Sequence, residues 1–223
     1  MSTAVSTNGT VASQRIAERL RDDILTGVLQ PGERIRQEDI AAQAGSSRLP
    51  VREALRILHS QGLVQLKANS GAWVATLDLV ECQAVYKMRE RLEPLALAES
   101  IPHIDSDTLE RIDDLQTQIE STADQDRFLA LDREMHLLCY AGNPNAELGR
   151  IVERFWNTTQ AYRRAFVRMS GPERMWVVNA EHRLLIDAIR RRDVDDGERF
   201  LVAHIRRTRE SLAHHPELFD AQA

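Results

Sequence analysis

An aspartate and a histidine one helical turn apart form the most chemically suggestive pattern in this chain. Asp132 and His136 are four residues apart, so both would project from one face of a helix, among apolar neighbours. His182 and His204 lie further along the chain, each beside apolar residues. Three neutral imidazoles and one carboxylate that meet inside a helical bundle suit a divalent cation such as Zn²⁺, Ni²⁺ or Mn²⁺. These four residues are therefore candidate metal ligands.

The same residues have plainer interpretations. A single histidine among apolar residues is more often a hydrogen-bonded interior residue than a ligand, and an Asp-x-x-x-His pair is also typical of a helical side-chain hydrogen bond. An Asp/His₃ site with open coordination positions would also suit a metalloenzyme, although no motif supplies a separate base or nucleophile. Because spacing along the chain does not show that side chains on different helices converge, it leaves these alternatives open.

A row of arginines forms a second candidate site, nearer the N-terminus. Arg48, Arg52 and Arg56 recur every four residues and so line one face of a predicted helix whose other face is apolar. Such a helix can lie in the major groove of DNA, where guanidinium groups bind guanine edges or phosphate oxygens. The alternative is a solvated charged face on which Arg56 pairs with an acidic residue. The turn before this helix and the hairpin after it favour DNA binding.

The arginine-bearing helix belongs to a short N-terminal module. Glycines and a proline interrupt its apolar pattern. Up to Gly62 the apolar residues have helical spacing, and after it their spacing is typical of short strands. A turn through Asn69 and Ser70 joins the two strands, and Lys67, Asn69 and Ser70 could reach phosphate or the minor groove. Three short helices followed by a hairpin predict a winged helix-turn-helix. We expect helices over 16–25, 37–44 and 47–61 and strands over 63–66 and 72–77.

The rest of the chain reads as helical, so the expected fold class is mainly α, with an all-α bundle after the winged helix. Six helical segments are expected, over 79–100, 107–121, 126–141, 145–169, 173–192 and 194–214. The domain organisation follows from the change in pattern. We expect a disordered tail over 1–12, a DNA-binding domain over 13–77, a helical effector- and metal-binding domain over 78–215, and a tail over 216–223.

Charge and composition indicate which partners and which cellular compartment to expect. The net charge of −5 is divided unevenly, with +2 up to Thr76 and −7 beyond it, so the two modules should bind different partners. Two cysteines do not make a disulfide framework, which indicates a reducing compartment. The first residues do not resemble a signal peptide, and no apolar run has the ~18 residues of a membrane span. A cytoplasmic protein without a membrane partner is expected.

The N-terminal module resembles the winged helix of the GntR family of bacterial transcription regulators. The resemblance rests on Pro31-Gly32-Glu33, Asp39-Ile40-Ala41, the run Ser47-Arg48-Leu49-Pro50-Val51-Arg52-Glu53-Ala54-Leu55, and Asn69-Ser70-Gly71-Ala72-Trp73-Val74. It implies DNA contacts from the recognition helix, including Ser47 and Leu49, and from the wing. Leu49 stands where the family usually has Thr, and Ser70 where a basic residue is common, so sequence specificity is expected to differ.

The C-terminal module resembles the FCD domain of the FadR branch of that family, and its six helices resemble the shorter VanR-like subgroup. The markers are Arg89-x-x-Leu92-Glu93, Asp132-x-x-x-His136, Asn143-Pro144, Glu181-His182 with Ala188-Ile189, and Ala203-His204. Many members hold a metal through one Asp and three His, which correspond here to Asp132, His136, His182 and His204. The resemblance also implies a small organic acid as effector, whose carboxylate completes the metal coordination.

The resemblance suggests the effector contacts as well. Arg89 matches a position that can offer a bidentate partner to a carboxylate, the alternative being an ion pair with Glu93 one turn on. Arg154, Asn157 and Arg163 are further candidates. The implied protein is not an enzyme but a homodimeric repressor that binds a palindromic operator and releases it with effector. A regulator with a purely structural metal and an effector that is not an acid is the second hypothesis.

Overall fold

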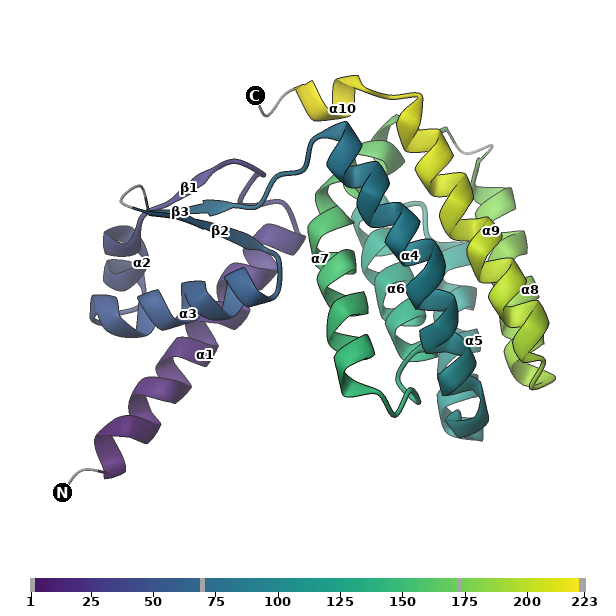
Figure 1. The fold of residues 1–223 in the computed structure, drawn as a ribbon, viewed down its shortest axis with the longest axis horizontal. Coiled ribbons are helices and arrows are strands. Elements are labelled where there is room, and N and C mark those ends of the chain that lie inside the picture. Colours follow the sequence, from purple (N-terminus) through teal and green to yellow (C-terminus); the bar gives the residue numbers. More distant parts are fainter. Residues whose placement is uncertain (1–2, 69–70, 172–173, 221–223) are drawn as a thin grey trace. The chain divides into compact units, whose positions relative to one another are not determined.

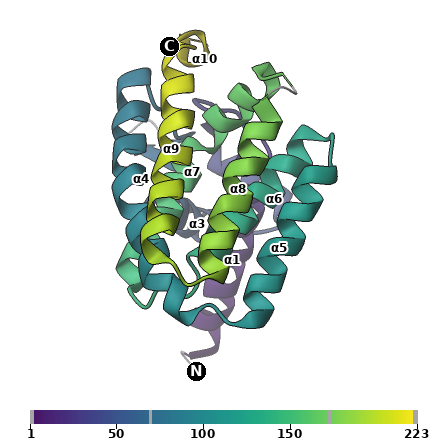
Figure 2. The same ribbon diagram turned by 90° about the vertical axis from the view of Figure 1, so that its right-hand side faces the viewer.

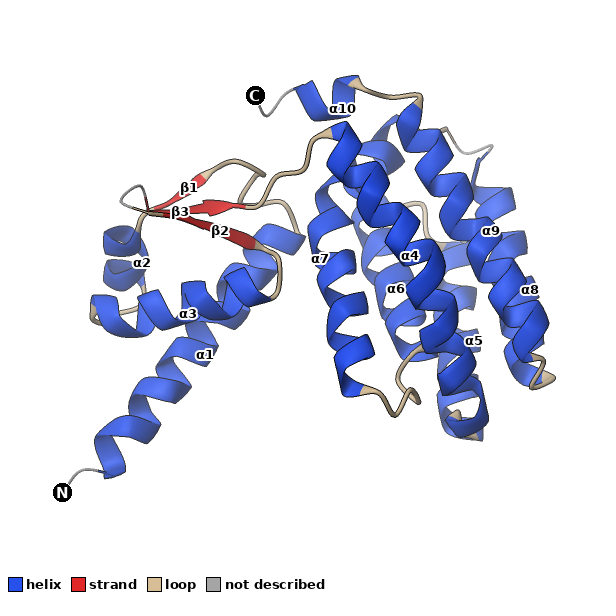
Figure 3. Ribbon diagram, in the orientation of Figure 1, coloured by secondary structure: helices blue, strands red, loops and turns tan. Residues whose placement is uncertain are grey.

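A computed structural model describes residues 3–68, 71–171 and 174–220, and the chain divides into two compact units. The division falls between Thr76 and Leu77, where the predicted change of pattern occurs. Each unit has its own hydrophobic core. All strands of the described chain belong to the N-terminal unit, as Figure 3 shows. The predicted fold class, a winged helix-turn-helix followed by an all-α bundle, is confirmed.

The N-terminal unit contains three helices, whose bounds are α1 Thr3–Leu25, α2 Gln37–Gln43 and α3 Arg48–Ser60. Helix α3 packs against α1 and α2 through Val51, Ala54, Leu55 and Leu58, all of which are buried. Gly45 has a φ of 57° in the turn between α2 and α3, a backbone conformation that glycine adopts without strain. Helix α3 therefore presents its polar face outward from a fixed position in this unit.

Three short strands form the wing, in the order β1-β3-β2 (Figure 1). Strands β2 Val64–Lys67 and β3 Gly71–Val74 form the predicted antiparallel hairpin. Strand β1, Arg34–Ile35, pairs with the other side of β3 and was not predicted, because two residues are too short to show an alternating pattern. The predicted turn residues Asn69 and Ser70 lie outside the described residues.

The C-terminal unit consists of helices with well-formed starts. Asp78, Asp105, Asp124, Asn145 and Asp193 occupy N-cap positions and accept backbone N–H groups with their side chains. The six predicted helices are present, and they are α4 Leu79–Ser100, α5 Ser106–Ser121, α6 Gln125–Cys139, α7 Ala146–Met169, α8 Met175–Arg190 and α9 Val194–Ala213. A short 3₁₀ turn, Ile101–His103, follows α4.

Helices α4 and α9 run side by side in both views of the bundle (Figures 1 and 2). Gly197 on α9 lies against the end of α4, since a Cβ atom there would lie 3.5 Å from Cδ2 of Leu97 and 3.1 Å from Cδ1 of Ile101, just after α4. Helix α5 packs on α6 and α8, and α7 packs on α4 and α6. The bundle thus brings faces of α4, α6, α7, α8 and α9 to one interior, where the candidate ligands lie. No helix in the described part of the chain is long and apolar enough to cross a bilayer.

Both predicted tails are corrected by the structure. Helix α1 begins at Thr3, so residues 3–12 continue the helix that the apolar spacing showed only from Ile16. At the other end, Glu217–Asp220 form helix α10, and Phe219 is buried against α7. The Phe219 ring stacks on Tyr162 at 4.7 Å between centroids. Phe219 and the partly buried Leu218 hold this segment against the core, and two adjacent apolar residues make no periodicity in a sequence.

Candidate functional site

Helices α6, α8 and α9 bring three histidines together. One ligand nitrogen from each of His136, His182 and His204 lies within 4.8 Å of the others. Nε2 of His136 is 3.3 Å from Nε2 of His182, and Oδ1 of Asp132 is 3.5 Å from the latter atom and 3.9 Å from the former. Asp132 and the first two histidines are fully buried, and His204 is partly buried. The four residues that the sequence singled out are therefore neighbours.

Hydrogen bonds identify the inward-facing nitrogen of His182. The side-chain amide of Gln116 donates to Glu120 at 3.1 Å and to Asn179 at 3.2 Å, which fixes its orientation. Its oxygen therefore faces Nδ1 of His182, at 2.8 Å, and that nitrogen must donate. In the neutral ring Nε2 then carries a lone pair.

The hydrogen bonds of His204 and His136 also assign the proton to Nδ1. Nδ1 of His204 lies 2.9 Å from the carboxylate of Glu181, which accepts hydrogen bonds only. The Tyr140 hydroxyl donates to Glu93 at 2.9 Å, so its oxygen is left to accept from Nδ1 of His136, 3.5 Å away. Each Nδ1 is thus assigned the proton, and each Nε2 is the nitrogen left for a ligand. Partners of this kind orient histidines that bind metals.

The protonation state of the cluster suits a cation. Burial, more than the neighbouring charges, lowers the pKa of His182 to about 3 and that of His136 well below its usual range. Burial would raise the pKa of Asp132, but Arg163 and the imidazoles outweigh it and hold that pKa well below normal. At neutral pH His136 and His182 therefore offer neutral nitrogens, and Asp132 offers a carboxylate. Two Nε2 lone pairs at 3.3 Å repel each other unless a cation lies between them, so the donor set fits a borderline divalent metal.

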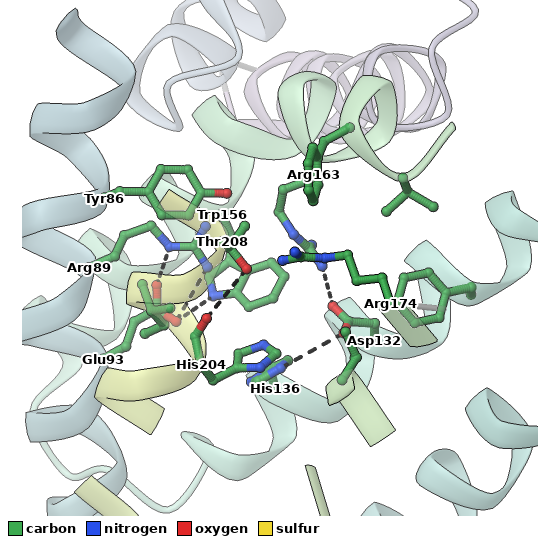
Figure 4. A pocket seen from close by; sticks show the side chains of 15 residues that line it. Tyr86, Arg89, Glu93, Asp132, His136, Trp156, Arg163, Arg174, His204 and Thr208 are labelled. Carbon is green, nitrogen blue, oxygen red and sulfur yellow. Dashed lines mark hydrogen bonds and ion pairs between the residues drawn. The ribbon is translucent and has the colours of Figure 1, made fainter. Parts of the chain in front are cut away.

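A pocket opens beside the cluster, and Figure 4 shows the side chains around it. Arg89, Trp156 and Arg163 line it together with Asp132, His136 and His204. Arg163 donates to Oδ2 of Asp132, and both guanidinium groups stack on the indole of Trp156, at 4.6 Å for Arg89 and 4.4 Å for Arg163. The pocket lining thus includes two arginines, each of which pairs with a carboxylate, Glu93 or Asp132.

The predicted effector residues fall into two groups. Arg89 lines the pocket and also forms the alternative ion pair with Glu93, and it donates to Thr159 at 2.9 Å. Arg163 lines the pocket as well. Asn157 does not line it, which argues against the predicted effector contact. Helix α7 turns Trp156 and Arg163 inward, and Asn157, one position on, instead accepts a hydrogen bond from Arg133 at 2.6 Å.

Sequence reasoning did not single out several residues of this site. Tyr86, Arg174 and Thr208 line the pocket, and two of the histidines are held by Gln116 and by Glu181, which the sequence offered only as a family marker. Glu181 directly precedes His182 in the chain, yet its partner is His204. Only the packing of different helices determines these contacts, so spacing gave no signal for them.

The DNA-binding candidates lie on the outer face of α3 and on the wing. Arg48, Leu49, Arg52 and Arg56 are exposed, as is Ser47 at the N-cap position. Arg48 pairs with Glu38 at 3.2 Å and Arg56 with Glu53 at 2.9 Å. These exposed pairs are worth little and exchange readily for phosphate, so the ion-pair alternative does not conflict with DNA binding.

The wing carries one cation that the sequence did not reveal. Lys67 lies 5.2 Å from the ring centroid of Trp73, and the guanidinium of Arg34 lies 5.6 Å from the same ring. Residues Arg34 and Trp73 are paired across β1 and β3. Two cations therefore flank one aromatic side chain on the hairpin, and Arg34 joins Lys67 as a candidate phosphate contact.

An amphipathic helix with an exposed arginine row, followed by a wing, defines a winged-helix DNA-binding protein. Comparison with known families agrees, because residues 12–74 match the gntR family of bacterial regulatory proteins and residues 84–207 match the FCD domain. The chain belongs to the GntR family and carries an FCD domain. It is a DNA-binding transcription regulator and not an enzyme.

Individual relatives extend over nearly the whole chain. The HTH-type transcriptional regulator YdhC of Bacillus subtilis is 25% identical over 88% of each chain. A probable D-xylose utilization operon transcriptional repressor of Paenarthrobacter nicotinovorans is 29% identical over 93% of this chain and 91% of the relative. Among solved structures, E. coli McbR/YncC is 21% identical, with a TM-score of 0.77 over 92% of this chain and 98% of that one, which supports the fold.

Proposed function

We propose that this protein is a homodimeric repressor whose helical domain senses a small organic acid at a divalent metal. The metal, Zn²⁺ first and Ni²⁺ or Mn²⁺ as alternatives, would be held by Asp132, His136, His182 and His204. The observation that carries the proposal is the cluster of three histidines whose Nδ1 atoms are all engaged, beside a pocket lined by arginines. A metal bound there supplies Lewis acidity and an open position for a carboxylate oxygen.

Arg163 is the residue best placed to respond to an acid. It donates to Asp132 within the pocket, so an incoming carboxylate would compete for the same guanidinium. Arg89 is already neutralised by Glu93 and held by Thr159, and it serves to fix the floor of the pocket. The effector would thus rearrange contacts between α6 and α7.

Repression and dimerisation rest on the family. The Paenarthrobacter relative is named a probable repressor, and the proposal extends that role to this chain. Two winged helices related by a two-fold axis would read the halves of a palindromic operator about one turn of DNA, roughly 34 Å, apart. A coupling of ~1–3 kcal/mol between effector and operator binding is typical and changes operator affinity about 5- to 150-fold.

The test uses full-length protein and a duplex that this protein selects from a random pool. We expect small carboxylates to weaken binding of the duplex to Zn²⁺-loaded wild type and to have no effect on the His136→Ala/His182→Ala variant. Equal carboxylate responses of the two proteins would contradict sensing at the metal. If chelation unfolds the helical domain and no carboxylate binds the loaded protein, the second hypothesis, a structural metal with another effector, replaces this one.

A further inference from the structure

The space beside the histidine cluster is small. We call it the head cavity; its volume is about 50 Å³. On this measure one water molecule needs roughly 10–15 Å³, so the cavity holds about three to five water molecules, which is enough for the acid group of an effector and a few further atoms. An effector larger than a short acid must therefore extend beyond it.

A second cavity adjoins the first and is much larger. This side cavity, of about 380 Å³, lies between the start of α6, the end of α7 and the start of α8. Phe128, Val167, Arg174 and Val178 line both cavities and so form the boundary between them. A ligand held in the head cavity would have to pass these four side chains to reach the side cavity.

The side cavity offers an apolar lining. Phe128, Val167, Met175 and Val178 supply most of it. Apart from Arg174 at the boundary, the main polar side chains on its wall have local partners: Asp124 caps α6, Gln125 donates to the Val167 carbonyl at 3.4 Å, and Ser170 donates to the Phe166 carbonyl at 2.9 Å. A wall of this kind favours a hydrocarbon body over a polar one.

Two polar groups near the boundary are free to bind an anion: the buried hydroxyl of Tyr86 and the half-buried guanidinium of Arg174. The Tyr86 hydroxyl is buried, lines the head cavity and has no hydrogen-bond partner among the described residues. Arg174 donates to Ser211 at 2.8 Å and packs on Phe166, but no described carboxylate forms an ion pair with it. In Figure 4 the guanidinium of Arg174 points toward Asp132 and Arg163, and the Tyr86 hydroxyl points into the same space. A buried donor and an unpaired cation favour an anion between them.

We infer that the effector is an amphiphilic monocarboxylate, whose acid group lies in the head cavity near Tyr86 and Arg174 and whose apolar body fills the side cavity. This inference rests on the proposed function, because it places the acid beside the metal cluster. It adds the chemical class of the body, which is aliphatic or aromatic. A sugar acid or a tricarboxylate would place hydroxyl or carboxylate groups against the apolar wall.

The experiment measures the Kd of acetate, butyrate, hexanoate and octanoate by calorimetry on full-length, Zn²⁺-loaded protein. Each buried methylene should tighten binding about three- to fourfold until the cavity is full. A Kd that stays constant from acetate to octanoate overturns the inference and leaves the proposed function standing. If no member binds, acetate included, the proposed function fails as well.

Variants of the protein distinguish binding of the acid group from binding of the apolar body. Met175 lines only the side cavity, so Met175→Asp should weaken octanoate at least tenfold and acetate hardly at all. Leu184→Asp is the matched control, since Leu184 is exposed on the same helix. Arg174→Gln should weaken all four acids by a similar factor.

A second substitution tests the side cavity independently, in case the Met175 variant misfolds. Ser170→Trp places a large side chain in the side cavity and should also abolish the chain-length dependence. If octanoate binds both variants as tightly as it binds wild type, the apolar body lies elsewhere and the inference is wrong.

Discussion

At the scale of single residues, the partners of the three histidines are as informative as the histidines themselves. Gln116, Glu181 and Tyr140 each occupy one Nδ1 atom, so the ring orientation is set before any ligand arrives. Such preorganisation lowers the cost of binding a cation, because the imidazoles do not have to be reoriented.

The role of Gln116 can be tested directly. Gln116→Leu removes the acceptor for Nδ1 of His182 while keeping a buried side chain of similar size. We expect the Zn²⁺ affinity, measured by competition with a chromophoric chelator, to fall about 10- to 100-fold. Gln118→Leu, on the same helix, is the control. An unchanged affinity in the Gln116 variant would show that His182 does not bind the metal through Nε2.

A second prediction at the residue scale concerns the arginine row of α3. Arg52 is 56% exposed, so Arg52→Ala removes a proposed DNA contact without disturbing the core of the winged helix. We expect affinity for the selected duplex to fall about tenfold or more, with helical content unchanged by circular dichroism. Arg15→Ala, an exposed arginine on α1, should bind like wild type. If the Arg52 variant binds the duplex as tightly as wild type, the assignment of α3 as the DNA-binding helix is wrong.

The sequence predicted only some of the site. The i, i+4 relation of Asp132 and His136 could be read directly, because both lie on one helix. His182 and His204 were candidates because they lie beside apolar residues, but their convergence with Asp132 rested on the family resemblance, since no spacing links side chains on α6, α8 and α9. Tyr86 and Arg174 escaped notice because lone aromatic and basic residues are common, and their burial beside the cluster is decided by packing alone.

At the scale of elements, regular periodicity was read correctly and short or isolated elements were not. The six long helices of the bundle have apolar residues at helical spacing, and five of them begin at an Asp or Asn cap, both of which a sequence displays. Strand β1 contributes two residues and α10 one turn, and each is stabilised by a partner distant in sequence: Trp73 opposite Arg34, and Tyr162 beneath Phe219. Tertiary contacts of that kind leave no local pattern.

Helix α10 gives the prediction that belongs to this scale. Phe219→Ala removes the ring that stacks on Tyr162, whose hydroxyl also bonds the backbone of Leu77. We expect a loss of about 2 kcal/mol in the free energy of unfolding, less than in a central core because the site lies at a chain end. The Tm of the helical unit should fall by roughly 4–8 °C. Glu217→Ala is the control, and a Tm of Phe219→Ala equal to that of wild type would mean that α10 does not pack there.

At the scale of the whole molecule, two units with separate cores carry different candidate sites. The N-terminal unit carries the DNA-binding face, and the C-terminal unit carries the buried cluster. The charge follows the same division, with +2 on the first 76 residues and −7 on the rest. A net negative helical domain does not compete for the phosphates that the winged helix contacts.

Metal removal should therefore act on one unit. A cation that binds only the folded bundle stabilises it by ~2.7 kcal/mol at a concentration 100-fold above Kd. We expect a chelator to lower the thermal transition of the C-terminal unit and to leave that of the winged helix in place, as followed by calorimetry. A shift of both transitions by the same amount would indicate that the ion acts elsewhere.

The content of bound metal tests the central claim most directly. Elemental analysis of purified full-length protein should find about one divalent ion per chain in wild type and less than about a tenth of that in the His136→Ala/His182→Ala variant. His214→Ala/His215→Ala, which alters two histidines outside the cluster, should retain the wild-type content. A double variant of His136 and His182 that keeps its full complement of metal would contradict the account.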